Sequence, residues 1–335
     1  MKIQYRINKN EEVEIVRCFG IDSKVVLPEQ IAGYPVCGVA AYAFSARKAK
    51  EEEDVLVYET DGGLFGAGAH LLAGDDIESV VFPNTVKQIG NYIFYGCKSL
   101  RKLEFSDTLV QIGSGAFTGC GQLAVLRVHL QNGEKSCVKE ILGDLWQRMD
   151  VTFYYEGTGS GKDSYGEVGC KKAIRAVNLV FPEHYEEAVE NTPARILFTQ
   201  HHGTGNNYRQ CFYNRQMDFR KYDELFPLAI AQDKPEVLAD MVFDRLESAY
   251  DLTEVHEKMY EDYVRKNLPE IVDYLVKQEN LKRLHLVSER RLWSEAGLDE
   301  AIRTAAEEDR PEVLSFLMNE KHLLFPQKKK KKFEL

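Results

Sequence analysis

The chain has 335 residues, of which 44% are hydrophobic and 29% are charged. These fractions are typical of globular proteins and exclude wholesale disorder or a fibrous fold. The length predicts about two domains. The formal net charge of −10 argues against a nucleic-acid or anionic-membrane partner, because an acidic protein repels a polyanion.

Residues 1–7 lack the apolar segment of a secretory signal peptide. The longest uncharged run, residues 108–126, holds four glycines and is not expected to span a bilayer. The seven cysteines include no Cys-x-x-Cys pair and no cysteine–histidine cluster at zinc spacing. We therefore expect a cytoplasmic protein with reduced thiols, no metal and no cofactor.

Residues 77–128 contain an internal repeat with a period of 23 residues, as from Ile77 to Leu100. Three copies of an apolar-x-x-apolar-x-apolar frame follow one another, which predicts strands with alternate side chains buried. A glycine, a phenylalanine and a cysteine recur behind the frame. The aligned positions are Ile77, Leu100 and Leu123; Val80, Leu103 and Leu126; Phe82, Phe105 and Val128; Gly90 and Gly113; Phe94 and Phe117; Cys97 and Cys120.

Each unit is expected to form a strand, a turn, a second short strand and a helical turn. One unit cannot bury both of its faces, so successive units must stack. Stacking would place Phe94 and Phe117 in one column and Cys97 and Cys120 in another. We expect these thiols to be buried and inert, because a reactive thiolate needs exposure and a cationic neighbour.

An earlier copy of the unit is visible in residues 25–28 and at Phe44. Because 50 residues, about two periods, separate Phe44 from Phe94, we expect a degenerate unit between them, with Val55 and Val57 in its strand. Before these repeats, apolar residues alternate in 3–7 and 13–15 and predict a β-hairpin that caps the stack.

The sequences Ile89-Gly90 with Phe94-Tyr95-Gly96-Cys97, and Ile112-Gly113 with Phe117-Thr118-Gly119-Cys120, carry a family resemblance. Over residues 1–128 the chain resembles the BspA-type (Treponema-type) leucine-rich repeats of bacteria. The resemblance implies a leucine-rich-repeat solenoid. Members of that family are often exported and adhesive, whereas the N-terminal residues here predict no export.

The second half of the chain has a different pattern. Residues 138–149 are expected to form a helix and residues 151–155 a closing strand, before closely spaced glycines interrupt regular structure. The predicted domains are a leucine-rich-repeat domain with its hairpin cap at 1–156, a glycine-rich linker at 157–170, a helical-repeat domain at 171–326 and a lysine-rich tail at 327–335.

Three prolines, Pro235, Pro269 and Pro311, anchor a common template. Apolar residues stand 2, 3, 6 and 7 positions after each proline and 5, 6, 9 and 10 positions before it, which predicts a pair of amphipathic helices. Proline suits a first helical turn, and we expect the Asp or Asn two residues earlier to cap it. These cap residues are Asp233, Asn267 and Asp309.

Residues 305–314 resemble the second half of an ankyrin repeat, so the C-terminal domain is interpreted as ankyrin-like, with a generic α-solenoid as the alternative. The uneven proline spacing of 34 and 42 residues predicts extra helix around residues 279–294. The predicted fold class is therefore an α+β two-domain repeat protein. Residues 171–222 fit neither template, although Tyr185, Ala188 and Val189 suggest a degenerate helical hairpin.

Three other segments invite a chemical interpretation. Residues 156–163 lack the first glycine and the Ser/Thr of a phosphate-binding loop, because Glu156 and Asp163 stand there, so a flexible linker is favoured. Adjacent His201 and His202 point apart in regular structure, so a solvent loop is favoured over a metal site. Residues 328–332 are five lysines; a solvated tail is favoured over a nucleic-acid or acidic-lipid contact.

The remaining functional candidate is the outer face of the repeat strands. Residues between the buried strand positions should point outward and align from unit to unit, which makes a rigid surface for a protein partner. These residues are Ser79, Val81, Lys102, Glu104, Val125 and Arg127. We predict a non-catalytic protein–protein interaction scaffold; the alternatives are an adhesin exported without a classical signal and an enzyme with a site in residues 157–222.

Overall fold

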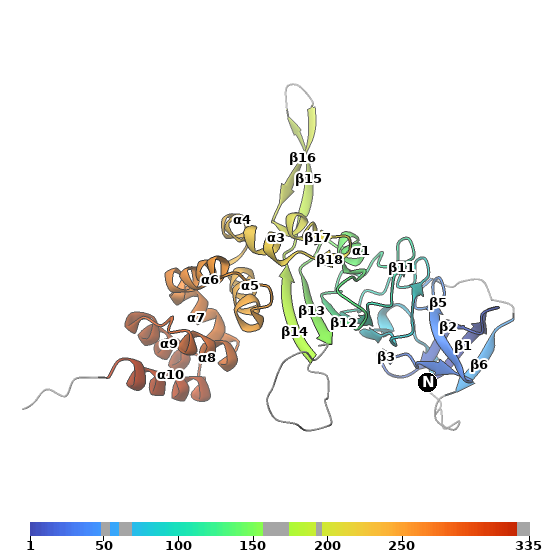
Figure 1. Ribbon diagram of the computed structural model, residues 1–335, viewed down its shortest axis with the longest axis horizontal. Coiled ribbons are helices and arrows are strands. Elements are labelled where there is room, and N and C mark those ends of the chain that lie inside the picture. The colour runs from blue at the N-terminus through green and yellow to red at the C-terminus, as the bar shows by residue number, and fades with distance from the viewer. Residues whose placement is uncertain (48–53, 60–68, 157–173, 192–195, 327–335) are drawn as a thin grey trace, which may run out of the picture. The chain divides into compact units, whose positions relative to one another are not determined.

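The computed structural model describes residues 1–47, 54–59, 69–156, 174–191 and 196–326. The chain divides into two compact units, Met1–Leu228 and Ala229–Leu335. Every strand among the described residues lies in the first unit, and the described part of the second is helical (Figure 1). The α+β class with a repeat solenoid is therefore confirmed.

The first unit is built on a six-stranded sheet. Its strands are β3 (Lys24–Val26), β8 (Ser79–Val81), β10 (Lys102–Ser106), β12 (Val125–Leu130), β13 (Met149–Glu156) and β14 (Ile174–Phe181). The spatial order is β14-β13-β12-β10-β8-β3, and every pair except β13/β14 is parallel. Leu103 and Phe105 of β10 are buried, as are Leu126 and Val128 of β12, so the predicted strand frame is confirmed.

A second line of short parallel strands runs through the same coils: β5 (Tyr34–Val39), β9 (Gln88–Ile89) and β11 (Gln111–Ile112). Behind them the rings of Phe44, Phe94 and Phe117 stack, with centroids 5.5 and 5.8 Å apart. The predicted phenylalanine column is thus confirmed. The thiols of Cys97 and Cys120 each donate to the carbonyl of the preceding coil's phenylalanine, at 3.1 and 3.2 Å.

The described residues show no degenerate unit between the coils of Phe44 and Phe94. These two rings stack on each other directly, and β3 pairs directly with β8, so the coils that contain them are neighbours. The strand near the expected position, β6 (Leu56–Glu59), pairs antiparallel with β1 (Lys2–Ile7) at the N-terminus. The extra residues are therefore an insertion between adjacent coils.

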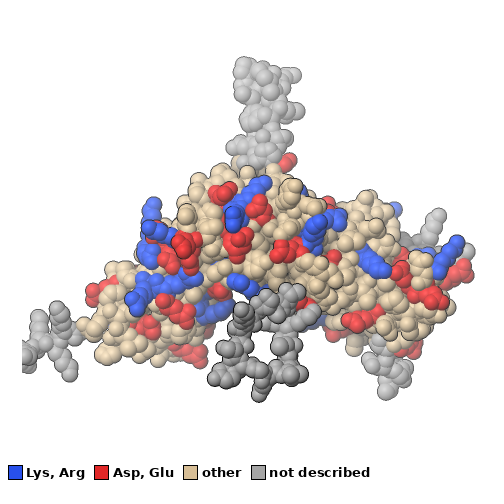
Figure 2. Space-filling model, viewed as in Figure 1, with Lys and Arg blue, Asp and Glu red and all other residues tan. Residues whose placement is uncertain are grey.

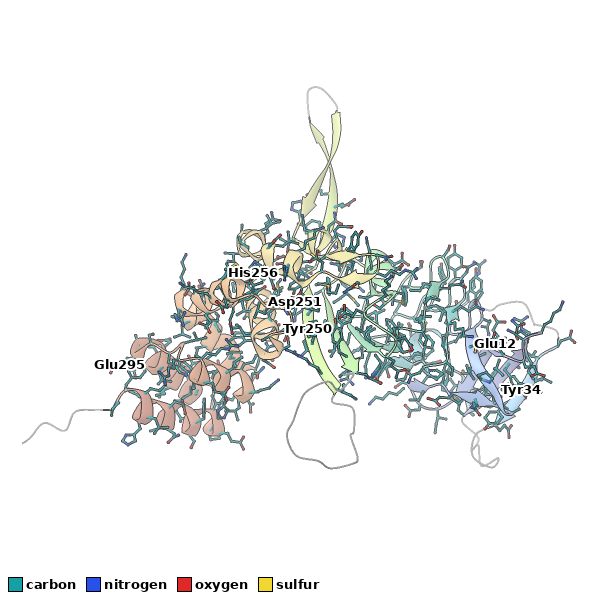
Figure 3. All side chains as sticks on the ribbon, in the orientation of Figure 1. Glu12, Tyr34, Tyr250, Asp251, His256 and Glu295 are labelled. Carbon is teal, nitrogen blue, oxygen red and sulfur yellow. The ribbon has the colours of Figure 1, made fainter. Side chains whose placement is uncertain are left out.

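The N-terminal hairpin is confirmed: β1 pairs antiparallel with β2 (Val13–Gly20). β2 in turn pairs with β5, which continues the hairpin into the second line of strands. The short strands β4 (Gln30–Ile31) and β7 (His70–Leu71) pair with β5 and β2, and η1 (Gly74–Asp76) is a 3-10 turn. Glu12, labelled in Figure 3, forms an ion pair with Lys87 of the repeats, in which its Oε1 lies 2.7 Å from the lysine Nζ.

The other end of the solenoid differs from the prediction. The helix α1 (Val138–Gly143) is shorter than the expected 138–149, and β13 is the expected closing strand. Residues 174–181 form β14, antiparallel to β13, and not the start of a helical domain. The boundary between the structural units therefore lies at Leu228, not near residue 156, because main-chain pairing ties this region to the sheet.

Strands also replace the degenerate helical hairpin expected after Pro182. β15 (Tyr185–Asn191) and β16 (Ile196–His202) form a separate antiparallel pair (Figure 1). After them come α2 (Gly205–Arg209), the short strands β17 (Phe212–Tyr213) and β18 (Gln216–Met217), and α3 (Phe219–Glu224). The spacing of Tyr185, Ala188 and Val189 suits one face of a helix, but pairing with β16 makes this segment a strand.

Arg209 holds this region together. Its side chain is buried and donates to the main-chain carbonyls of five residues at 2.7–3.1 Å. The acceptors are Leu142, Leu145, Gln147, Pro182 and Gly205. Because a planar guanidinium can serve several carbonyls at once, one side chain joins α1, the start of β13 and the end of β14.

The helical unit has the predicted hairpins. The helices are α4 (Phe226–Gln232), α5 (Pro235–Ser248), α6 (Glu254–Lys266), α7 (Leu268–Lys277), α8 (Leu281–Glu289), α9 (Glu295–Glu307) and α10 (Pro311–Leu324). The first of them, α4, crosses the boundary between the two units. Proline stands in the first turn of α5, α7 and α10, and α8 is the predicted extra helix.

The predicted caps are wrong. The N-cap residues are Lys234 in α5, Asn267 in α7 and Arg310 in α10, and none of these side chains makes a capping hydrogen bond. Asp233 and Asp309 therefore do not stand at the N-cap, and Asn267 does not cap through its side chain. Side-chain caps occur instead at the helices that do not begin with proline, from Thr253, Asn280 and Ser294. No helix among the described residues is long and apolar enough to cross a bilayer.

Candidate functional site

The strand register brings the six predicted partner-binding residues together. Ser79 of β8, Lys102 of β10 and Val125 of β12 are lateral neighbours in one row. Val81, Glu104 and Arg127 form the next row, two residues along each strand. The residue between the two members of each strand is buried (Val80, Leu103 and Leu126), so the six side chains lie on the outer face of the sheet. Of the six, Arg127 is exposed and the other five are half-buried.

Glu104 is the centre of an ion cluster on this outer face. Its Oε2 lies 2.8 Å from Nζ of Lys102 and 3.8 Å from Nη1 of Arg127, and its Oε1 lies 3.0 Å from Nε2 of His129. The carboxylate side chain is 20% exposed, whereas that of Arg127 is 45% exposed. The cluster therefore presents cations at its rim, with the anion recessed among them.

Two opposing effects set the pKa of Glu104. Burial raises the pKa of Glu104, but the hydrogen bonds from Lys102 and His129 together lower it by more, so this pKa lies below its ordinary value. Glu104 is therefore ionised at neutral pH. A recessed carboxylate that is already engaged by Lys102, Arg127 and His129 orients those side chains, and a partner would meet the two cations, Lys102 and Arg127.

The face extends beyond the six predicted residues. On β12 and β13 the ring of His129 stacks on that of Tyr154, with centroids 4.9 Å apart. Thr152 donates to the side-chain oxygen of Asn178 at 2.8 Å. On the other side, Lys24 and Val26 of β3 continue the two rows. The alternation of apolar and polar residues within 24–27 and 149–155 indicates which side chains point outward. Only the strand register shows that these strands join the same face.

The outer face combines apolar and charged side chains. Val26 is 61% exposed and lies beside Val81, while charged side chains dominate β10 and β12. Figure 2 shows basic and acidic side chains interspersed on the visible side of the molecule. Such a mixed, preformed surface can bind a protein partner with little loss of side-chain freedom.

The other candidates supply no catalytic constellation among the described residues. Burial raises the pKa of Cys97 and of Cys120 to about 12, so both thiols stay protonated at neutral pH. His202 stacks on Tyr185 at 4.4 Å and pairs with Glu187 at 3.2 Å. No group of three or more His, Cys, Asp or Glu side chains in the described ranges could hold a metal ion.

Several sequence candidates fall outside the described residues. These are the loop 157–163 and the lysines 328–332; the side chain of His201 is likewise not described. Residues 157–173 and 192–195 of the segment 157–222, where the enzyme alternative places its site, also lie outside the described residues.

Comparison with known families decides the nature of the repeats. Residues 68–140 match the family described as the BspA type leucine rich repeat region. These residues are BspA-type leucine-rich repeats. The leucine-rich repeats cover β8, β10 and β12, which carry the six predicted residues of the outer face. They support a repeat-based interaction or adhesin-type role, and leucine-rich-repeat proteins are generally not enzymes.

Two solved leucine-rich-repeat structures are similar to this chain. One is a leucine rich cell surface protein from Faecalibacterium prausnitzii, 21% identical with a TM-score of 0.27; the match covers 40% of this chain and 29% of that one. The other is a leucine rich repeat protein of T. pallidum, 22% identical with a TM-score of 0.21, covering 41% of this chain and 73% of that one. No curated protein matches the sequence.

These comparisons contradict the predicted cytoplasmic localisation. The leucine-rich repeats match the BspA type, a family whose members are often exported and adhesive. The cytoplasmic prediction is therefore wrong. The resemblance of the helical hairpins to ankyrin repeats is not confirmed, because the family match ends at residue 140.

Proposed function

We propose that this chain is a non-catalytic binding protein of the cell surface, and that the outer face of its leucine-rich repeats binds a protein ligand. The observation that carries the proposal is the lateral register of β8, β10 and β12, which assembles six side chains into two aligned rows. The BspA-type match supports an adhesin-type role for such a face.

The chemistry of the outer face suits a protein ligand. Lys102 and Arg127 present positive charge around the recessed Glu104, and Nε2 of His129 lies 3.0 Å from its Oε1. Val125 and Val81 place apolar surface on either side of β10. Cations at the rim steer association and set specificity, while the apolar contacts contribute affinity.

A photoreactive side chain at Val125 tests the location of the site. It should crosslink the ligand on intact source cells, whereas the same group at Val110, an exposed valine outside the main sheet, should not. Equal crosslinking from the two positions would contradict the proposal.

A charge swap tests the chemistry of the site. Lys102→Glu combined with Glu104→Lys keeps the net charge but inverts the centre of the face, so crosslinking through Val125 should fall by about tenfold. The matched control is the swap Asp273→Lys with Lys277→Asp, which inverts an exposed 2.8 Å ion pair of α7 and should change nothing.

Surface location is tested separately. An impermeant amine-reactive label applied to intact cells should modify this chain at about the extent seen after lysis. Protection in intact cells and modification only after lysis would refute the surface part of the proposal without affecting the binding face.

A further inference from the structure

The two edge strands of the six-stranded sheet, β14 and β3, have different surroundings. At one end β14 is covered: Oη of Tyr222 donates to the carbonyl of Val180 at 2.6 Å, and the ring of Phe181 stacks on Phe212 at 5.9 Å. At the other end β3 pairs only with β8 among the described strands. The sheet thus has one capped edge and one open edge.

The hydrogen bonds of β3 show which main-chain groups face the open edge. Ser79 donates to the carbonyl of Ser23 at 3.2 Å, and Leu27 donates to the carbonyl of Val81 at 3.0 Å. In a parallel pair alternate residues bond to the neighbouring strand, so Lys24 and Val26 direct their main-chain groups outward. Asp22 Oδ1 accepts from the N–H of Lys24 at 2.9 Å. The N–H and carbonyl of Val26 have no partner among the described residues.

A groove of about 440 Å³ runs beside this edge. The lining combines main chain with apolar side chains: Met1, Gly20, Ile21, Asp22, Lys24, Val25, Val26, Leu27, Pro28 and Leu72. Ile21 is 78% exposed and Val26 is 61% exposed. The apolar row of Val81 and Val26 on the outer face therefore continues up to the open edge.

Lys24 places a positive charge beside the open edge, which favours an acidic side chain in any strand added there. Its side chain is exposed, on the same side of β3 as that of Val26, and its ammonium group has no carboxylate partner among the described residues. A strand added at this edge would place one side chain beside Val26 and another, two positions away, beside Lys24.

We propose that the open edge of β3 binds an extended segment of a protein ligand as an additional strand, with an apolar side chain beside Val26 and an acidic side chain beside Lys24. Main-chain groups that point outward from a sheet edge select an extended chain, and the flanking side chains select its sequence. This site is the edge of the sheet and not its outer face, so it stands or fails independently of the proposed function.

A second copy of this chain fits the edge less well. If two copies of β3 paired antiparallel through Val26, Pro28 of one copy would stand opposite Lys24 of the other, and Pro28 offers no charge. The exposed ammonium group would then keep no partner. An acidic residue next to an apolar one in the added strand satisfies both positions.

The probe is the capped heptapeptide Thr-Glu-Thr-Val-Thr-Glu-Thr. Its valine has a glutamate two residues away on each side, so it meets the requirement in either direction of pairing, and threonine favours extended structure. The control peptide carries lysine in place of both glutamates. Titration of the labelled peptides into the full chain, followed by fluorescence anisotropy, should show the glutamate peptide binding about fivefold more tightly than the lysine peptide.

Two variants locate the binding. Lys24→Glu should invert the preference, so that the lysine peptide becomes the tighter ligand; a variant that merely failed to fold could not gain affinity. Val26→Pro removes the outward N–H without removing a bond to β8, and should abolish binding of the glutamate peptide.

Three results would overturn the proposal. One is the absence of saturable binding of either peptide to the full chain, and another is equal affinity for the two peptides. The third is sedimentation of the full chain as a dimer that Val26→Pro converts to a monomer, because a second copy would then occupy the edge. Loss of ligand crosslinking through Val125 would refute the outer-face site and leave this edge unaffected.

Discussion

Phe94 shows how a single side chain joins neighbouring coils. Its side chain is fully buried, and its ring stacks between those of Phe44 and Phe117. Its carbonyl oxygen also accepts a hydrogen bond from the thiol of Cys120. The same residue type at the same position in successive units thus produces both the aromatic column and a buried acceptor for each cysteine.

Removing this ring should be costly. Phe94→Ala leaves a cavity between two coils, and we expect the free energy of unfolding to fall by about 3–5 kcal/mol in urea titrations. Tyr213→Ala, which removes a ring that is 80% exposed, is the matched control and should cost less than about 0.5 kcal/mol. An equal effect of the two substitutions would contradict the stacked column.

Glu104 makes the stability of the first unit depend on pH. Its pKa is lowered from 4.5 in the folded chain, so the folded state binds its proton less readily than the unfolded chain does. The contribution is fully present above about pH 4.5 and is lost as the pH falls through the lowered pKa. Because the carboxylate is partly exposed, we expect less than about 1 kcal/mol.

The comparison with Glu104→Gln isolates this effect. The difference in unfolding free energy between the wild type and the variant, measured by urea titration, should be largest at neutral pH. It should shrink below about pH 4.5 as the wild-type carboxylate is protonated. A difference that grew on acidification would show that Glu104 does not stabilise the folded chain through its charge.

At the level of the repeat unit, the glycine that ends each short strand sets the spacing of the coils. A Cβ atom on Gly113 would lie 2.3 Å from the main chain of Gly90, and one on Gly90 would lie 2.2 Å from the main-chain nitrogen of Ala41. Both clashes are with main chain, which cannot rotate away. The glycine column therefore reflects close approach of successive coils.

Gly113→Ala should force two coils apart. We expect a loss of about 2–3 kcal/mol in unfolding free energy, together with weaker stacking of Phe94 on Phe117. Gly121→Ala is the control, because a Cβ atom there meets nothing within 4 Å, and it should change stability by less than about 0.5 kcal/mol. Urea titrations followed by circular dichroism measure both.

The sequence predicted elements well where a pattern recurred and poorly where it did not. The repeat strands, the phenylalanine column and the proline-led helices recur several times, so chance is a poor explanation for them. β14 and β15 occur once, and their short apolar runs suit either a strand or a helix. The structure of β14 depends on β13, whose edge accepts it as an antiparallel partner, and that of β15 depends on its pairing with β16.

The candidate site was predictable to the same extent. The alternation in residues 79–81, 102–104 and 125–127 identifies six outward side chains, and the period of 23 residues aligns them. His129 and Tyr154 were missed because they come from a strand end and from a strand outside the repeat. The open edge at Val26 was missed because the absence of a neighbouring strand leaves no trace in local sequence.

At the scale of the whole molecule, each compact unit has its own buried core. Phe94 belongs to the first unit, and Leu275 of α7, which is fully buried, belongs to the second. Units of this kind commonly unfold in separate steps.

Calorimetry should therefore resolve two transitions. Phe94→Ala should lower the midpoint of one, and Leu275→Ala, which also leaves a buried cavity, should lower that of the other. If both substitutions lowered the midpoint of a single transition, the two units would be unfolding as one cooperative body.

The amino-acid sequence alone determined the repeat period, the buried face of each strand and the helical hairpins, because these follow from local spacing of apolar side chains. Tertiary structure alone decided that Phe44 and Phe94 are direct neighbours, that residues 174–181 belong to the sheet, and that β3 ends it. Each of these depends on pairing between main-chain segments distant in sequence, and main-chain hydrogen bonds are nearly the same for every residue type.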